Sequence, residues 1–101
     1  MSKNPVIALV LVTVERSKIE EVAQRLLALN GVSEVFSVAG RYDLVVVLRT
    51  QTNEQIADLV TARILEIPHI TRTETLMAFK AYSRDDLGAM FSIGNEDAKE
   101  S

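Results

Sequence analysis

Two short segments of this sequence are apolar at almost every position, and they restrict the possible folds more than any other feature. One covers residues 6–14, and the other covers residues 42–49 with an unbroken apolar run at 44–48. Both are short for a helix and rich in β-branched residues, so we expect strands. Successive side chains of a strand point to opposite faces of its sheet. Each of these strands must therefore be covered on both faces.

Two further segments have the spacing of amphipathic helices. An S-x-x-E capping box that starts at Ser17 should begin the first helix, and Gly31 should end it in a left-handed conformation. Thr52 or Asn53 should cap the second helix, which should stop before Pro68. The residues of the two apolar stripes recur at helical spacing and are Ile19, Val22, Ala23, Leu26 and Leu27, then Ile56, Leu59, Val60, Ile64 and Ile67.

Two more polar strands complete the pattern. Residues 32–39 form the first of them, and their polarity suits the edge of a sheet. Gly40 and Arg41 predict a tight type II′ turn into the strand at 42–49, because glycine accepts positive φ at the first central position. Residues 70–82 alternate in side-chain direction and form the last strand.

The order of these elements is strand, helix, strand, strand, helix, strand. With right-handed crossovers it predicts an α+β, ferredoxin-like βαββαβ sandwich, in which a four-stranded antiparallel sheet of order 4-1-3-2 carries two helices on one face. This order places the strands at 6–14 and 42–49 in the centre. They are also the two most apolar strands, so topology and hydrophobicity agree independently.

The face of the sheet away from the helices also needs a cover. One of two alternating sets in the first strand must lie on it, either Ile7, Leu9 and Leu11 or Val6, Ala8, Val10 and Val12. Either set leaves a larger apolar patch than soluble monomers usually expose. We therefore expect a homodimer through the sheet faces, or a larger homo-oligomer.

Length and charge narrow the classes of function. The 101 residues suffice for one domain, placed at 1–82, and a partly disordered tail at 83–101 with a helical turn near Leu87, Met90 and Phe91. The net charge is −3 and the eleven Lys and Arg residues are scattered, so no direct contact with nucleic acid is expected. The longest apolar run is too short to span a membrane, and the start lacks a secretion leader. We expect a cytoplasmic protein.

Residues for catalysis or metal binding are scarce. His69 is the one histidine and cysteine is absent, so a zinc or transition-metal site cannot be completed, and His69 should be a solvated loop residue. The pattern places no histidine near a serine, and the four glycines lie too far apart for a phosphate-binding loop. We expect neither an enzyme nor a bound metal or cofactor.

Gly40, Arg41, Tyr42 and Asp43 form the cluster that suggests a small-molecule site. They place a glycine backbone, a guanidinium, a phenol and a carboxylate within four residues. Asp43 could bind the α-ammonium group of a free amino acid while N–H groups near Gly40 bind its α-carboxylate. The alternative is a plain hairpin in which Asp43 bonds the N–H groups of the turn.

Threonines of the last strand could add hydroxyl contacts to such a ligand. They stand at alternate positions and are Thr71, Thr73 and Thr75. Threonine is also a good strand former, which explains the same pattern without a ligand.

Three stretches carry a resemblance to a known family: Asn30-Gly31-Val32 at a helix exit, Gly40-Arg41-Tyr42-Asp43-Leu44 at the hairpin, and Thr71-Arg72-Thr73-Glu74-Thr75 in the last strand. In this βαββαβ order they resemble the effector domain of Lrp/AsnC transcription regulators, the RAM domain (regulation of amino-acid metabolism). The resemblance covers residues 5–82. Family members usually carry an N-terminal helix-turn-helix domain, for which this chain has no room, so it looks like a stand-alone RAM protein.

The resemblance implies a function, partners and a site. Domains of the family dimerise through their sheets, dimers often assemble into rings, and amino-acid effectors bind between dimers near a Gly-x-x-Asp hairpin. Full-length Lrp/AsnC regulators are then possible partners, whose control of transcription this chain would modulate by co-assembly. The ligand-binding residues implied are Gly40, Arg41, Tyr42, Asp43, Thr73 and Thr75.

Other functions stay open beside this one. A small dimeric ferredoxin-like enzyme of the monooxygenase or isomerase kind shares the face-to-face sheets, although such sites usually need a histidine, tryptophan or asparagine, and this chain has no tryptophan. An ACT-like regulatory domain shares the strand order and amino-acid binding. A structural adaptor would bind no ligand. A ligand between dimers would indicate sensing, and one inside a protomer would indicate an enzyme.

Overall fold

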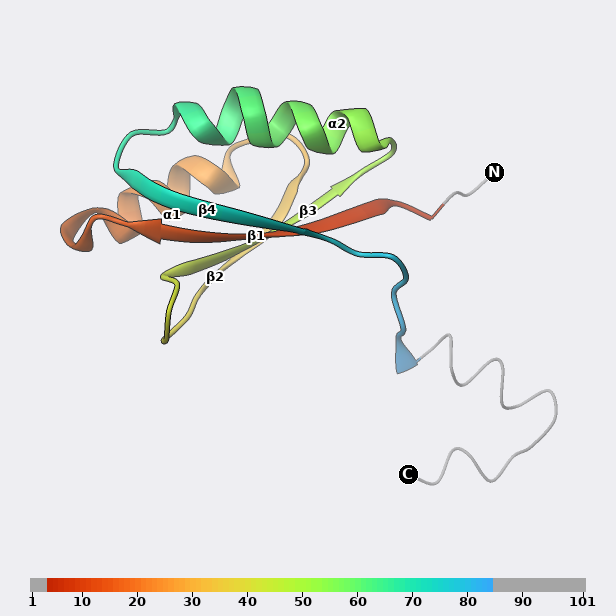
Figure 1. The fold of residues 1–101 in the computed structure, drawn as a ribbon, viewed down its shortest axis with the longest axis horizontal. Coiled ribbons are helices and arrows are strands. Elements are labelled where there is room, and N and C mark those ends of the chain that lie inside the picture. The colour runs from red at the N-terminus through yellow and green to blue at the C-terminus, as the bar shows by residue number, and fades with distance from the viewer. Residues whose placement is uncertain (1–3, 85–101) are drawn as a thin grey trace, which may run out of the picture.

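The computed structural model describes residues 4–84, which form one sheet with two helical segments (Figure 1). The first half contains β1 (Val6–Val14), the short 3-10 turn η1 (Arg16–Lys18), α1 (Ile19–Leu27) and β2 (Val32–Ser37). The second half contains β3 (Leu44–Thr50), α2 (Asn53–Asp58), the π-helical turn η2 (Leu59–Arg63), the 3-10 turn η3 (Ile64–Glu66) and β4 (Ile70–Met77). The strand and helix order is the expected βαββαβ.

The sheet has the order β2-β3-β1-β4, and every neighbouring pair is antiparallel. This is the predicted order 4-1-3-2 read from the other edge. The register aligns Val10 of β1 with Val46 of β3 and with Thr75 of β4. The two most apolar strands, β1 and β3, are central, as the pattern predicted.

The core lies between one face of the sheet and the two helical segments. From the sheet, it takes alternate residues of β1 and β3, and from the helices it takes the predicted apolar stripes. The buried members are Ala8, Val10, Val12, Val14, Leu44, Val46 and Leu48 from the sheet, and Val22, Leu26, Ile56, Leu59, Ile64 and Ile67 from the helical segments and the residue after η3. The set with Ala8 and Val10 therefore faces the helices. Ile7, Leu9 and Leu11 lie on the open face.

Four strand boundaries differ from the predicted ones. β2 ends at Ser37 rather than 39, β3 begins at Leu44 rather than 42 and ends at Thr50 rather than 49, and β4 ends at Met77 rather than 82. The first two changes arise because residues 38–43 form a loop. β4 leaves the sheet slightly before the end of its partner β1: after Ala8 pairs with Met77, the N–H group of Ala78 donates to Ile7 O (2.9 Å), and Ile7 then pairs only with β3.

The two helix starts are built differently. The predicted capping box at Ser17 is wrong, because the 3-10 turn precedes α1 and neither start has a capping hydrogen bond from a side chain. At α2 the cap is Thr52: its side chain accepts from Gln55 N–H (3.1 Å), and the Gln55 side chain accepts from Thr52 N–H (3.2 Å). The second helix thus begins where the pattern placed it, and its last turns pass through η2 and η3 before Pro68.

Gly31 connects α1 to β2 in a conformation that only glycine adopts easily. Its φ is +101°, as expected for the residue after a helix. A Cβ atom at this position would lie 2.6 Å from Leu59 Cδ1. Gly31 therefore allows the turn and also lets η2 pack closely against it.

Most of the predicted tail lies outside the described residues, including the helical turn proposed near Leu87, Met90 and Phe91. Within residues 4–84, none of the helices is long and apolar enough to cross a membrane.

Candidate functional site

The loop between β2 and β3 contains the predicted ligand-binding cluster. Its closing backbone hydrogen bond runs from Val38 N–H to Asp43 O (3.0 Å), so four residues lie between the bonded pair. Gly40 has positive φ (+126°), as predicted, but the two-residue type II′ turn at Gly40 and Arg41 is wrong because the loop is wider. We call residues 38–43 the β2–β3 loop.

Asp43 fixes the β2–β3 loop to the central strand β1. Its N–H group donates to Val12 O (2.9 Å), and its Oδ2 accepts from Val14 N–H (2.8 Å). Val14 lies where the register between β1 and β4 shifts, so the carboxylate satisfies a backbone donor at an irregular point of the sheet. The carboxylate is half-buried and bonds a strand N–H group instead of the turn N–H groups of the plain-hairpin alternative.

Tyr42 fixes the same loop to the edge strand β4. Its phenol donates a hydrogen bond to Glu74 Oε1. This hydrogen bond raises the pKa of Tyr42, with smaller contributions from desolvation and from the Glu74 charge, whereas the guanidinium groups of Arg72 and Arg41 act in the opposite direction. The β2–β3 loop is therefore hydrogen-bonded to both β1 and β4.

Glu74 received no role from the sequence patterns. A signal was present, because the register places Phe36, Val45, Leu11 and Glu74 in one row across the sheet. Glu74 is the charged member of an otherwise apolar row. Its phenol partner could not be predicted, since that contact depends on the path of the β2–β3 loop.

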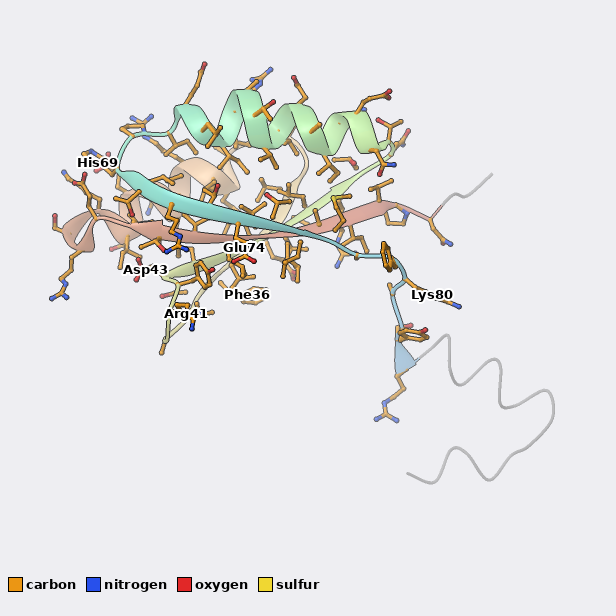
Figure 2. The ribbon with its side chains drawn as sticks, viewed as in Figure 1. Phe36, Arg41, Asp43, His69, Glu74 and Lys80 are labelled. Carbon is orange, nitrogen blue, oxygen red and sulfur yellow. The ribbon has the colours of Figure 1, made fainter. Side chains whose placement is uncertain are left out.

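Figure 2 shows Phe36, Arg41, Asp43 and Glu74 on the side of the sheet opposite α2. Arg41 is exposed, and its charge and that of Arg72 both act on Tyr42. The loop presents Arg41 and Asp43, and the neighbouring strand β4 adds Arg72 and Glu74, so side chains of both charges lie together. Such a mixture can bind both charged groups of a zwitterion.

Thr73 and Thr75 lie elsewhere. They pair with Val12 and Val10, whose side chains face the helices, so they occupy the other face of β4. Thr75 lines an open cleft of about 640 Å³ between β4 and α2, together with Ile56 and Val60. Within one chain, the structure brings Gly40, Arg41, Tyr42 and Asp43 together and leaves Thr73 and Thr75 separated from them by the sheet. Thr71 donates its hydroxyl to Thr13 O (3.2 Å).

The open face of the sheet is apolar in its centre. Leu9 pairs with Val47 on one side and with Leu76 on the other, and Leu11 pairs with Val45. On the two edge strands, Phe36 is 49 % exposed and Leu76 is 43 % exposed. We call these apolar residues the open-face cluster: Ile7, Leu9, Leu11, Phe36, Val45, Val47 and Leu76.

His69, just before β4, contacts Glu15 through both its side chain and its backbone. As expected, His69 is a partly exposed residue of the turn before β4, where its Nδ1 lies 3.2 Å from Glu15 Oε1 and its carbonyl accepts from Glu15 N–H (3.0 Å). Its φ is +77°, which is unusual for a residue with a side chain. Within residues 4–84, no group of three potential metal ligands occurs.

Comparison with known proteins agrees with this architecture. Residues 7–87 match the family model of the Lrp/AsnC ligand binding domain, which overlaps the predicted resemblance at 5–82 but starts and ends slightly later. The HTH-type transcriptional regulator FL11 of Pyrococcus abyssi is 32 % identical over 76 residues, which are 75 % of this chain and 50 % of FL11. The chain spans about half the length of the curated relatives it matches.

Two solved structures extend the comparison. TTHA0845 of Thermus thermophilus is 39 % identical with a TM-score of 0.74, and the match covers 78 % of this chain and 99 % of that one. The feast or famine regulatory protein Rv3291c of M. tuberculosis, solved in complex with L-methionine, is 25 % identical with a TM-score of 0.66, over 79 % of this chain and 54 % of that one. Since the family model matches the sheet, the helices and the β2–β3 loop together, this chain belongs to the Lrp/AsnC ligand binding domain family.

Proposed function

We propose that this chain is a non-enzymatic module that binds a free amino acid, forms oligomers through its sheet, and modulates transcription by assembling with other regulators in the cytoplasm. One observation carries the proposal: a loop with charges of both signs is anchored at the margin of an apolar open face. Membership of the Lrp/AsnC ligand binding domain family and the methionine complex of Rv3291c support the class of ligand.

The open-face cluster supports the oligomer. Its central residues Leu9 and Val47 pair with each other across β1 and β3, while Phe36 and Leu76 at the two edges stay almost half exposed. An apolar sheet face of this kind is normally covered by a second layer. A second copy supplies that layer through the same face, as in an isologous dimer.

The β2–β3 loop supports the ligand site. Asp43 Oδ2 is bonded to Val14 N–H, so the α-ammonium group of a ligand would approach the other oxygen, Oδ1. Arg41 and the N–H groups near Gly40 would receive the α-carboxylate. Tyr42 would line the site from its position on Glu74. Thr73 and Thr75 face the other way and would contribute only from a neighbouring copy.

A thermal-shift screen of the twenty amino acids tests this function. A ligand at about 100 times its Kd adds about 2.7 kcal/mol to the free energy of unfolding, which raises the Tm of a domain of this size by about 10–20 °C. Asp43→Ala should abolish the shift. Asp43→Asn, which keeps an oxygen for Val14 N–H but removes the charge, should fold normally and still lose the shift.

The same screen can refute the proposal. A Tm that stays constant with all twenty amino acids would show that the domain is not an amino-acid sensor. A shift that persists in Asp43→Asn and in Arg41→Ala would place the ligand away from the β2–β3 loop.

A further inference from the structure

The chain beyond β4 forms an extended arm with exposed aromatic side chains. We call residues 78–84 the arm. It leaves the sheet after Ala78 N–H has bonded Ile7 O, and Figure 1 shows it turning to the side of the sheet away from the helices. Phe79 is fully exposed at the rim of the cleft between β4 and α2, and Tyr82, further along the arm, is 72 % exposed. Lys80 Nζ lies 5.5 Å from the centre of the Tyr82 ring.

We propose that the arm packs on a second copy of this chain, over the beginning of that copy's β2, and clasps the dimer from the outside. The inference rests on the sheet-to-sheet dimer proposed above. The Tyr82 ring, largely exposed beside Lys80, gains free energy when a second copy buries it.

The arm points in the required direction and has the required length. Facing sheets pack about 10 Å apart. Seven residues in extended conformation span about 23 Å, at about 3.3 Å per residue. Because the arm turns toward the open-face side, it reaches past the layer in which a second sheet would lie.

The register places the arm at one end of the sheet. Met77, Ala8, Leu48 and Val32 form one row across the four strands, so the arm starts at the level where β2 begins. With a twofold axis parallel to the strands, β4 of one copy lies over β2 of the other at the same level. The arm then meets the region of Glu34. If the twofold axis instead lies between the two sheets and runs perpendicular to the strands, the arm meets the beginning of the other copy's β4, near Arg72.

Charge favours the first arrangement. The arm carries Lys80 and Arg84 and no acidic residue. Glu34 is exposed on the open face of β2, whereas Arg72 occupies the corresponding place on β4. Arg49, on the neighbouring strand β3, donates its Nε–H group to Ser33 Oγ of β2 (3.2 Å). A cationic arm is therefore better matched by Glu34 than by Arg72.

Disulfide trapping tests this arrangement directly, because the chain has no native cysteine. In the Glu34→Cys/Lys80→Cys variant, the two cysteines of one chain stand at opposite edges of the sheet, about 14 Å apart from the strand spacing alone. A disulfide requires Cα atoms within about 7 Å, so only two different chains can be linked. The Arg72→Cys/Lys80→Cys variant is the matched control for the other axis.

The expected result is a covalent dimer for the Glu34 pair and none for the Arg72 pair on a non-reducing gel. Light scattering of the reduced variants separates the possible failures. A dimer that links through Arg72, or through neither pair, overturns the arm placement and leaves the sheet dimer intact. A monomer overturns both the arm and the proposed assembly.

A second variant keeps the test independent of disulfide geometry. Tyr82→Ala should raise the dimer Kd about tenfold or more, as expected when a buried interface aromatic is truncated. Leu65→Ala is the matched control, since Leu65 is also an exposed apolar residue (57 %) but lies on η3, on the helix side. An unchanged Kd for Tyr82→Ala would show that the arm is not part of the interface.

Discussion

At the level of single residues, Gly31 should tolerate a side chain less well than Gly40. A Cβ atom there combines positive φ with a 2.6 Å approach to Leu59 Cδ1. We predict that Gly31→Ala lowers the free energy of unfolding by about 1–3 kcal/mol. Gly40→Ala is the control, since Gly40 has positive φ but nothing within 4 Å, and it should lose less. Urea unfolding of both variants measures the difference, and equal losses would mean that Leu59 moves aside.

The Tyr42–Glu74 hydrogen bond gives a prediction for alkaline pH. The pKa of Tyr42 is raised above 10.0 in the folded chain. A raised folded pKa means that the hydrogen bond stabilises the fold fully below about pH 10, and this contribution is lost as the pH rises through the folded pKa. Tyr42→Phe should therefore be less stable than the wild type at pH 8, and the difference should shrink at pH 11. A pH-independent difference in urea midpoints would argue against the hydrogen bond.

At the level of elements, the two helix starts are a matched pair. Thr52 and Gln55 form a reciprocal capping box, whereas Ser17 makes no capping hydrogen bond. We predict that Thr52→Ala costs about 1 kcal/mol of stability and that Ser17→Ala leaves stability nearly unchanged. Chemical denaturation measures both values. A comparable loss of stability in Ser17→Ala would show that Ser17 does cap the first helix, as the sequence suggested.

Local patterns predict whole elements better than they predict element ends. The S-x-x-E pattern at Ser17 matches the residue types of a capping box, but the chain makes a 3-10 turn after β1 before α1 begins. Periodicity identified every strand and helix because it depends on many residues at once. Boundaries were less accurate because they depend on a partner: β4 stops where β1 no longer pairs with it.

At the level of the whole molecule, the sheet order followed from the sequence because hydrophobicity and chain connectivity gave the same two central strands. The loop cluster from Gly40 to Asp43 was also identified, although its anchors were not. Val14 N–H and Glu74 lie 29 and 32 residues away from their partners in the loop. Contacts at such separations have no local pattern and become visible only once the sheet register is known.

The open-face cluster provides a test of the assembly by mutation. Leu9 is at its centre, between Val47 and Leu76. We predict that Leu9→Lys separates the dimer into folded monomers, because a charged side chain cannot be desolvated in an apolar interface without a partner. Circular dichroism checks that the variant is folded, and light scattering gives its mass. A folded Leu9→Lys dimer would place the interface elsewhere.

The mass of the wild-type protein in solution decides whether this domain works as an assembly built on its open face. Sedimentation equilibrium at micromolar concentration should give at least twice the 11.2 kDa of one chain. A stable mass of 11.2 kDa, with the open-face cluster left in water, would show that the domain does not assemble in this way.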